Sequence, residues 1–521
     1  MSSADVKLGG VDRRLVVGAA VILACTVGVF GSYNFVVNPI SSDLNATQGQ
    51  SLLLRELPSI GTLVVVFIVG LLGTRLGMKR VIVASAVIMT LGYVLVMLGA
   101  TVIAVIFGML MGSIGKQGIA VVTVSLIATH LTSDANRATG FAALGMASPF
   151  GYVVTPIAAG LLLDATNWRV AVGLWVFVAV VATVAALMLL PPDGPRERAG
   201  ELWTPALAGL VLVGVVQCIR LVNLEGLTAP RTLIWLAIAL ISLLALWQLM
   251  VRLHEPTLDL AILKKGSAVL LLVVIMLLSF TNLCYYFSIG VQRVYGLSAT
   301  QVALLLVPCQ LAGIAGAWIA GRGIKRRGLR AVGTLMLLGV STALLLTTTQ
   351  QVDTFVIVPT LILCLFAFAS TGGGVVMTNA FMNLAPPGRA GSASALRGAA
   401  TSVGVATGVA FSAIVFFGTT QTTFHDLVTR NKGDVTIANK IADRLHDATS
   451  TREEVATAYS LPLKVVTDYD KELLAAQVTG YRAQGLLGGL LALAAAILFF
   501  FVQGRRSVGT GDAPKSTTPT R

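Results

Sequence analysis

Long apolar segments without charged residues recur along most of the chain, and they leave few folds open to it. The stretch from Val81 to Gly115, for example, contains no Asp, Glu, Lys or Arg. A helix rises about 1.5 Å per residue, so about 20 apolar residues cross the roughly 30 Å of a bilayer's hydrocarbon layer. No segment alternates polar and apolar residues as the strands of a membrane barrel do. With 56% apolar and 12% charged residues, the chain is predicted to be an all-α polytopic membrane protein.

Fourteen membrane-spanning helices are predicted from these segments and the polar loops between them. The first follows Arg13 and Arg14 and has no small-residue cleavage site, so it is predicted to be a retained helix and not a signal peptide. The predicted spans are residues 13–37, 52–74, 80–99, 102–130, 137–163, 169–190, 204–223, 231–251, 267–292, 300–321, 330–349, 355–383, 390–417 and 481–503.

Two bundles of six helices with an inserted helix pair between them are predicted from the order of these spans. A linker rich in proline, glycine and charge follows the sixth span, and a polar segment, here named the external segment, interrupts the second bundle. The predicted units are a tail over 1–12, a first bundle over 13–190, a linker over 191–203, the inserted pair over 204–251, a linker over 252–266, a second bundle over 267–503 that includes the external segment over 418–480, and a tail over 504–521.

A short basic turn occurs twice, each time where a long apolar helix ends. The same offset separates all four positions of the two copies, which differ before the arginine, where Thr74 corresponds to Lys325. This repetition predicts a duplicated bundle with both turns on one membrane face. The glycines permit close approach and sharp turning, and the arginines suit pairing with carbonyls or acids of a neighbouring helix, so a gate is predicted there. The predicted gate residues are Gly70, Arg75, Gly77 and Lys79 in one copy, and Gly321, Arg326, Gly328 and Arg330 in the other.

The distribution of basic residues predicts the orientation of the chain. Most Lys and Arg residues lie in the tails and in the loops that carry the basic turns, whereas the short loops of the other face hold only Arg169, Arg231 and Arg293. By the positive-inside rule, the basic turns and both termini are predicted to be cytoplasmic, in a multi-pass protein of the plasma membrane. Contact of this basic face with the lipid bilayer accounts for the net charge of +14, so no nucleic-acid partner is expected.

The patterns of several other protein classes are missing from the sequence. The five cysteines lie inside predicted spans without CxxC or Cys/His ligand spacing, so they are interpreted as packing residues and no metal is expected. Neither a GxxxxGK[ST] phosphate-binding loop nor a GxSxG nucleophile motif occurs. We therefore predict a protein that is not an enzyme, needs no cofactor and functions as a monomer.

The sequence resembles a known transporter family in both halves. The doubled basic turn is similar to the cytoplasmic signature of the major facilitator superfamily, and fourteen spans with a central helix pair resemble its drug:H+ antiporter branch. The resemblance implies two pseudo-symmetric bundles that alternately open to each side of the membrane. Further similar positions are Pro39, Gly112, Gly115, Arg137, Pro156, Gly160, Trp168 and Arg169 in the first half, and Tyr285, Tyr286, Gln292, Val294, Gly296, Ser298, Pro308, the run from Arg389 to Leu396, Gly404 and Gly408 in the second.

The chain departs from that branch where protons are coupled. The branch typically has an acid in helix one, but this chain has none between Arg14 and Asp43, and both basic turns lack their acid. Gly108 stands where such antiporters often have an arginine in helix four. Thr401 stands where the branch often has an arginine in helix thirteen, one turn after Arg397. The resemblance therefore implies transport more firmly than proton antiport.

Ionisable residues inside predicted spans are the best candidates for a substrate or coupling site, because they are costly there and usually face a cavity or a partner. Lys116, followed by Gln117, is the deepest charge; it either faces the site, neutralises Glu56 or bonds backbone carbonyls. Arg397 either faces inward or extends toward the cytoplasm. Glu56, beside Arg55, is either a surface charge or a proton carrier. Uncharged candidates, which either orient substrate or bond between helices, are Asn34, Asn282, Tyr286 and Gln310.

Glycine and proline in helices five and thirteen are interpreted as hinges or as packing seams. The hinge candidates are Gly151, Pro156, Gly160, Gly404 and Gly408. The external segment shows helical spacing at Val435–Leu445 and Leu473–Val478, and it is interpreted as a solvated helical hairpin or as a partner-binding domain.

Three functions remain open from the sequence. The first is a secondary transporter that exports a small amphipathic or drug-like molecule, with or without proton coupling. The second is an organic-anion carrier with Lys116 and Arg397 as counter-charges. The third is a membrane sensor or scaffold that transports nothing, which leaves the duplicated gate without a purpose.

Overall fold

The computed structural model describes residues 9–193, 201–253, 261–281, 295, 297, 299–386, 389–445 and 451–509. Helices form all the regular secondary structure of these residues. They are α1 (Gly10–Asp43), α2 (Gln48–Leu76), α3 (Met78–Leu98), α4 (Val102–His130), α5 (Asp134–Ala165), α6 (Trp168–Leu189), α7 (Trp203–Glu225), α8 (Pro230–Arg252), η1 (Ala261–Lys264), α9 (Gly266–Phe280), α11 (Ala299–Leu346), η2 (Thr347–Thr349), α12 (Ile357–Met382), α13 (Ala390–Arg430), α14 (Val435–Leu445), α15 (Arg452–Ala458) and α16 (Leu463–Gly509).

Twelve of the described helices are long and apolar enough to cross a membrane, which supports a multi-pass membrane protein. The predicted number of fourteen is not confirmed. It would require α11 to count twice, divided at Gly328, whose φ of 78° interrupts the helix. It would also require α9, whose 15 residues are too few alone; the rest of that predicted span, residues 282–292, lies outside the described residues.

Polar side chains begin several helices and set the turns between them. The Thr47 hydroxyl and the Gln50 side chain form a reciprocal cap at the start of α2, which satisfies amide groups that have no partner within the helix. The Ser133 side chain accepts a backbone N–H at the start of α5, and the Asn167 side chain accepts one at the start of α6. Between α2 and α3 the chain turns at Gly77, whose φ of 103° suits glycine.

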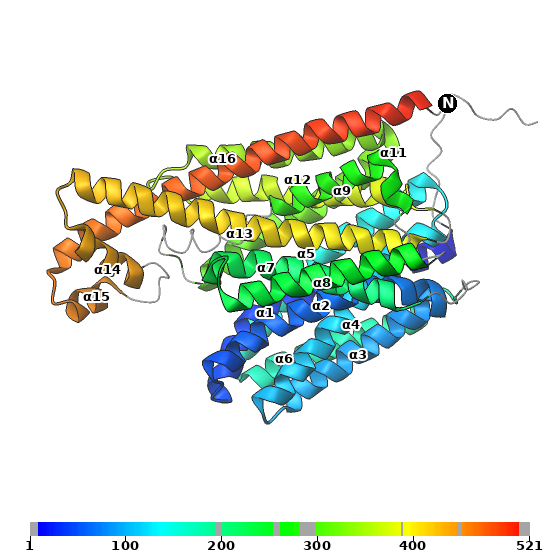
Figure 1. Cartoon of the computed structure of the whole chain (residues 1–521), viewed down its shortest axis with the longest axis horizontal. Coiled ribbons are helices and arrows are strands. Elements are labelled where there is room, and N and C mark those ends of the chain that lie inside the picture. Colours follow the sequence, from blue (N-terminus) through cyan, green and yellow to red (C-terminus); the bar gives the residue numbers. More distant parts are fainter. Residues whose placement is uncertain are drawn as a thin grey trace, which may run out of the picture.

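The spanning helices form two halves that lie against each other (Figure 1). Helices α1 to α6 make up the first half, and α9, α11, α12, α13 and α16 make up the second. Trp175 is fully buried in the first half, where its indole N–H donates to the Ser32 hydroxyl at 2.8 Å. The start of α1 and the end of α16 lie at one end of the bundle (Figure 1). That end also carries the basic turns, and we call it the motif side.

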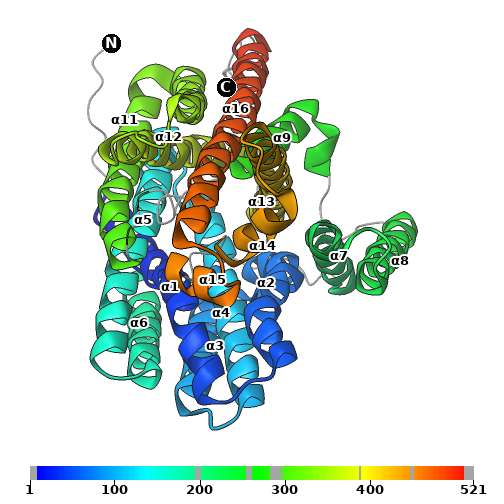
Figure 2. The same cartoon turned by 90° about the vertical axis from the view of Figure 1, so that its left-hand side faces the viewer.

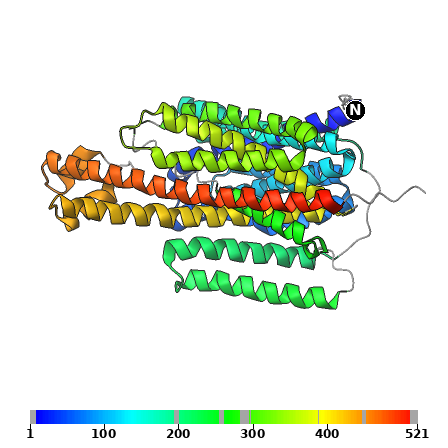
Figure 3. The ribbon, with the colours of Figure 1, turned by 90° about the horizontal axis from the view of Figure 1, so that it is seen from above.

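The inserted pair lies outside the bundle, beside α2 and α13 (Figures 2 and 3). A Cβ atom on Gly209 of α7 would lie 2.2 Å from the Val64 carbonyl oxygen of α2, so these two helices are in backbone contact. Helix α8 packs on α7 and exposes large apolar side chains such as Leu244 and Trp247. That composition suits contact with lipid.

Helices α13 and α16 continue beyond the spans predicted for them and carry α14 and α15 at the end away from the motif side (Figure 1). The spans predicted at 390–417 and 481–503 are therefore parts of longer helices. Helix α14 covers Val435–Leu445, the range that showed helical spacing in the sequence. These helices enclose a separate small core, and Arg452 of α15 donates to the buried Asp470 carboxylate of α16 at 2.7 Å. The external segment is thus a packed helical unit.

Candidate transport cavity and its seal

The two halves touch closely on the motif side, at the glycine that opens the first basic turn. A Cβ atom on Gly391 of α13 would lie 2.2 Å from the carbonyl oxygen of Gly70 of α2, so only glycine fits there without moving the helices. Helices α4 and α13 are also joined, because the Ser394 hydroxyl donates to the Val121 carbonyl at 2.9 Å. These contacts close the seam between α2, α4 and α13.

A second seam, between α5 and α11, closes in a related way. A Cβ atom on Gly321, the first residue of the second basic turn, would lie 2.4 Å from the Ala142 Cβ atom. At the same end, the Arg137 guanidinium donates to the Asn383 side-chain oxygen at 3.1 Å. Both basic turns therefore begin with a glycine that lies at a contact between the halves.

The first basic turn is fastened to helix α6 of its own half. The Asp193 carboxylate accepts the backbone N–H of Lys79 at 2.7 Å and pairs with Arg80 at 3.7 Å. The Lys79 ammonium group donates to the carbonyls of Leu187 and Leu190 at 2.8 and 2.9 Å. The Asp193 carboxylate lies at the start of α3 and the Lys79 ammonium group lies at the end of α6, and both placements are electrostatically favourable. Asp193 was missed in the sequence, where its position at the end of a predicted span was the available signal.

The second basic turn is fastened to the last helix of its own half. The Arg330 guanidinium carbon lies 3.7 Å from the centre of the Phe500 ring of α16, a favourable cation–π distance. Arg75 is half-buried and Arg326 is exposed. Within the described residues, neither forms an ion pair across the halves, so the pairing role suggested for the arginines remains a prediction.

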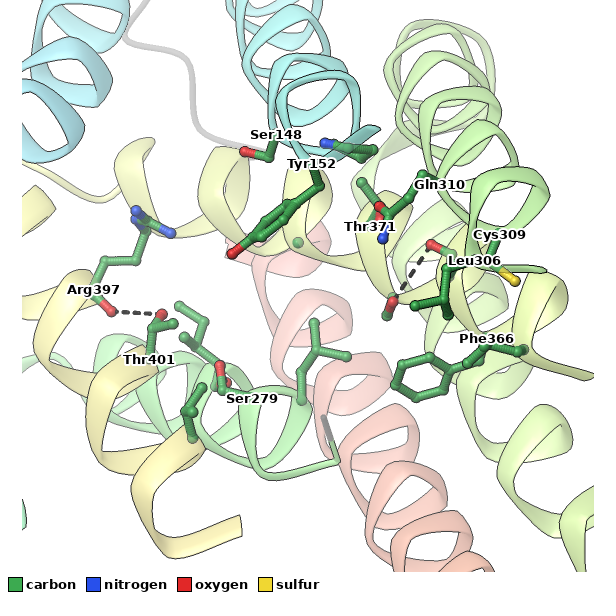
Figure 4. Close-up of a pocket in the computed structure, with 18 residues that line it drawn as sticks. Ser148, Tyr152, Ser279, Leu306, Cys309, Gln310, Phe366, Thr371, Arg397 and Thr401 are labelled. Atoms are coloured by element: carbon green, nitrogen blue, oxygen red, sulfur yellow. Dashed lines mark hydrogen bonds between the residues drawn. The ribbon is translucent and has the colours of Figure 1, made fainter. Parts of the chain in front are cut away.

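A cavity of about 470 Å³ lies between the halves. Helix α5 contributes to its wall from the first half, and α9, α11, α12 and α13 contribute from the second. Tyr152 directs its hydroxyl toward the side where Arg397 and Thr401 lie, and Gln310 and Thr371 lie on the other side (Figure 4). The remaining wall is largely apolar, with side chains such as Leu306, Leu363 and Phe366. Such a cavity suits a molecule with both polar and apolar parts.

Arg397 faces this cavity, which decides between the two orientations left open by the sequence. Its terminal nitrogen lies 3.4 Å from the Thr378 hydroxyl, and its buried Nε atom has no hydrogen-bond partner among the described residues. The Thr401 hydroxyl, one turn further, donates to the Arg397 carbonyl at 3.0 Å. The guanidinium therefore has donor capacity left for a ligand.

Lys116 and Gln117 are half-buried on α4 and are not among the described residues that line the cavity. Helices α2 and α4 run parallel, with Gly61 against Leu110 and Gly73 against Val122. This register places the backbone of Glu56 eleven residues, or about 16 Å along the helix, from the level of Lys116. The pairing considered from the sequence remains a prediction, because the side chain of Glu56 lies outside the described residues.

The remaining candidates divide into placed and unplaced residues. Gln310 lines the cavity. Asn282 and Tyr286 lie outside the described residues, as do the side chains of Asn34, Arg55 and Glu56.

Four of the five hinge candidates lie at seams within one half or the other. Cβ atoms on Gly151, Gly404 and Gly408 would lie 2.3, 2.4 and 2.3 Å from carbonyl oxygens of the first helix of the same half. Pro156 contacts α1 near Gly31, and no atom lies within 4 Å of a Cβ atom on Gly160. Gly151, Pro156, Gly404 and Gly408 are therefore at packing seams in this conformation and Gly160 is not, and a hinge role for all five remains a prediction.

Several cavity residues were missed in the sequence, because serine, threonine and single aromatic residues are common in membrane helices. The available signal was a polar pair one turn apart on one helix face. Ser148 and Tyr152 form such a pair on α5, and Arg397 and Thr401 form one on α13.

Two bundles of apolar helices around a cavity walled by both, and sealed at one end, define a membrane transporter. The chain belongs to the Major Facilitator Superfamily, because the profile of that family matches residues 19–409. This confirms the family expected from the basic turns.

A relative described as the tetracenomycin C resistance and export protein of Streptomyces glaucescens is 27% identical over 278 residues. The match covers 52% of this chain and 51% of the relative, so the chain spans about half the length of the curated relative it matches.

Solved structures share the fold at low sequence identity. The human organic anion transporter MFSD10 (TETRAN) has a TM-score of 0.60 at 14% identity, with 94% of this chain and 99% of that chain covered. A bacterial homologue of the iron transporter ferroportin in an outward-facing state has a TM-score of 0.56 at 14% identity, covering 95% and 100%. The proton:xylose symporter XylE has a TM-score of 0.55 at 12% identity, covering 94% of each chain. At these identities the likeness shows the fold alone.

Proposed function

We propose that this protein exports a small amphipathic organic compound, neutral or anionic, across the cytoplasmic membrane by alternating access. The observation that carries the proposal is the composition of the cavity. Its described wall contains one charged side chain, Arg397, and no acid. A site of this kind attracts anions and neutral acceptors and disfavours cations, which would leave the guanidinium beside a like charge.

The size and walls of the cavity fit such a substrate. Sites for drug-sized molecules usually enclose about 300 to 1,000 Å³ and are mostly apolar with a few polar groups, and this cavity has about 470 Å³. Because both halves contribute to the wall, movement of one half against the other would expose the cavity to each side in turn. The glycine contacts of Gly70 and Gly321 would act as the seal on the motif side, which we take as cytoplasmic from the positive-inside rule.

The direction of transport and its coupling are further parts of the proposal. Export is supported by the relative described as a resistance and export protein. Proton coupling has no acid to use in the described cavity wall, which leaves Glu56 as the proton carrier suggested by the sequence. A driving pH gradient is therefore a variable of the test.

An organic-anion carrier is the second candidate, and the observation in its favour is Arg397 facing the cavity. In this version Arg397 would bind the anionic group directly, since charge-assisted hydrogen bonds are the stronger ones. Lys116 would act from outside the described wall. The two candidates differ in whether an uncharged analogue is transported at all.

The deciding experiment uses purified protein in proteoliposomes with a pair of fluorescent compounds of one skeleton, one a carboxylate and one its amide. Arg397→Gln is compared with wild type and with Arg397→Lys, with and without a pH gradient. We expect Arg397→Gln to reduce carboxylate transport about 10-fold or more, as for loss of a hydrogen bond to a charged group, and to change amide transport little. Arg397→Lys should retain most carboxylate transport.

Each outcome selects one reading. Equal loss of both compounds would mean that Arg397 is structural and would contradict the proposed selectivity. Absence of amide transport in wild type would favour the anion carrier. A dependence on the pH gradient would establish proton coupling.

A further inference from the structure

Two cysteines from different helices meet at the wall of the cavity. The sulfur of Cys309 on α11 lies 3.6 Å from the sulfur of Cys364 on α12. Cys309 lines the cavity and is almost fully buried, and Cys364 is half-buried. Figure 4 shows Cys309 beside Leu306 and Gln310. The two residues are far apart in the sequence, so no local spacing indicates the pair.

Tight packing of α11 against α12 fixes this distance. A Cβ atom on Gly316 would lie 2.0 Å from the Phe368 carbonyl oxygen, and one on Gly372 would lie 3.0 Å from the Gly316 carbonyl oxygen. Small residues at such positions let two backbones approach closely in a membrane. The Cys309 thiol is also held by the Leu305 carbonyl at 3.6 Å. The two sulfurs therefore belong to a rigid part of the second half.

We propose that Cys309 and Cys364 form a dithiol site that takes a thiophilic ligand able to bind two sulfurs at once, a monosubstituted trivalent arsenical. Two sulfurs bound at about 2.3 Å to one pyramidal trivalent centre, at an angle of about 100°, lie about 3.5 Å apart, close to the 3.6 Å observed. A disulfide would instead need the sulfurs to approach to about 2.05 Å. The pair is thus spaced for chelation, and soft ligands are the ones that thiolates select.

The binding step is an exchange of ligands without oxidation or reduction. A trivalent arsenical carries one organic group and two hydroxyl groups on arsenic. Two As–S bonds form and two As–O bonds break. The two thiol protons leave with the two hydroxyl groups as two molecules of water. Arsenic remains trivalent, so the step needs no further reactant.

A bound arsenical would occupy space that a transported compound needs. Cys309 lies one turn after Leu306 and directly before Gln310 on α11, all three line the cavity, and Phe366 lies across from them. Occupation of the dithiol site should therefore block transport. Binding itself does not depend on the proposed function, and only this inhibition rests on it.

The test measures binding of phenylarsine oxide to the purified full-length protein by intact mass spectrometry. Cys25, Cys218 and Cys284 are first replaced by serine, so that only the pair remains. We expect one phenylarsenic group per chain, stable to excess 2-mercaptoethanol and removed by 2,3-dimercaptopropanol. Cys309→Ser and Cys364→Ser should each weaken binding at least 100-fold, because one sulfur cannot chelate.

Two results would overturn the inference. One is binding that survives 2-mercaptoethanol in either single variant; the other is binding to the denatured chain only. Cys309→Ala and Cys364→Ala serve as second variants if a serine variant elutes as an aggregate. In proteoliposomes, phenylarsine oxide should inhibit the two-cysteine protein reversibly and should not inhibit Cys364→Ala, whose altered residue is not among those that line the cavity. Stable binding without inhibition would contradict the place of the site on the transport path, while failure of the carboxylate test alone would not affect it.

Discussion

A single methyl group at Gly391 should open the motif side of the transporter. In Gly391→Ala the new Cβ atom would lie 2.2 Å from the carbonyl oxygen of Gly70, whereas real Cβ contacts are essentially never shorter than 3.0 Å. Helices α2 and α13 must therefore separate by at least 0.8 Å. Since α2 belongs to one half and α13 to the other, only the state with the motif side closed contains this clash.

The size of the effect follows from the cost of overpacking, which is about 1–3 kcal/mol for one inserted carbon in a packed site. If that cost applies to the closed state alone, the ratio of closed to open protein falls about 5- to 150-fold. Gly408→Ala is the matched control. Its Cβ atom would lie 2.3 Å from the Phe280 carbonyl oxygen of α9, a similar clash inside one half. It should lower stability in both states and leave their ratio unchanged.

The assay is a spin-label distance measurement across the motif side, with labels at Leu76 and Lys325, which are both exposed. The native cysteines are first replaced. Gly391→Ala should populate a longer distance than the parent protein, and Gly408→Ala should not. Thermal unfolding in detergent should be lowered clearly for Gly408→Ala. The reasoning is refuted if Gly391→Ala keeps the parent distance distribution, or if both variants shift it equally.

Three further predictions concern polar contacts at the ends of the helices. The Asp43 carboxylate is exposed and lies outside the candidate spans. Its pKa is lowered by the Trp168 indole N–H and then by the Arg169 guanidinium. Because the folded-state pKa is lowered, these contacts stabilise the fold above the usual pKa of about 3.9, and this stabilisation is lost as pH falls through the lower value. In acid titrations of unfolding temperature, Asp43→Asn should lose less stability than wild type over that range, and parallel curves would contradict the assignment. Asp193→Ala should lower stability by about 1–2 kcal/mol, as for loss of a helix cap, with Asp193→Asn in between; an unchanged unfolding temperature would show that the carboxylate is dispensable. Arg452→Ala removes the side chain that lies 2.7 Å from the buried Asp470 carboxylate. The change should speed hydrogen exchange in α14 and α15 by an amount equivalent to about 1–3 kcal/mol. Exchange at the wild-type rate would show that this ion pair does not hold the external helical unit together.

The sequence predicted the fold better than the site, for a physical reason. The composition of a helix depends on whether its outer face meets lipid or water, so lipid-facing helices and their basic ends can be predicted from the sequence. The residues that line a transport cavity are harder to identify from the sequence. Tyr152 and Thr371 are ordinary residues of membrane helices, and their convergence depends on how five helices meet. The division of α11 at Gly328 is equally hidden, because the apolar pattern continues through it.

A charged residue inside a predicted span identified a cavity residue in one case and not in another. Arg397 was identified from its cost in a membrane and does face the cavity. Lys116 satisfied the same criterion and lies outside the described wall. Asp193, which fastens the first basic turn, escaped notice because an acid in a loop costs nothing in the sequence and gains its role from the approach of α6 to α3.

The position of the inserted pair makes the two routes from the bilayer to the cavity unequal. Helix α7 is in backbone contact with α2 at Gly209 and also packs on α13, so it covers the seam where those two helices meet. Among the described helices, none covers the seam between α5 and α11 (Figure 2). A lipophilic compound dissolved in the membrane therefore meets two layers of helix at the seam between α2 and α13 and one layer at the seam between α5 and α11. A compound that enters the cavity directly from the bilayer is therefore expected to pass the seam between α5 and α11.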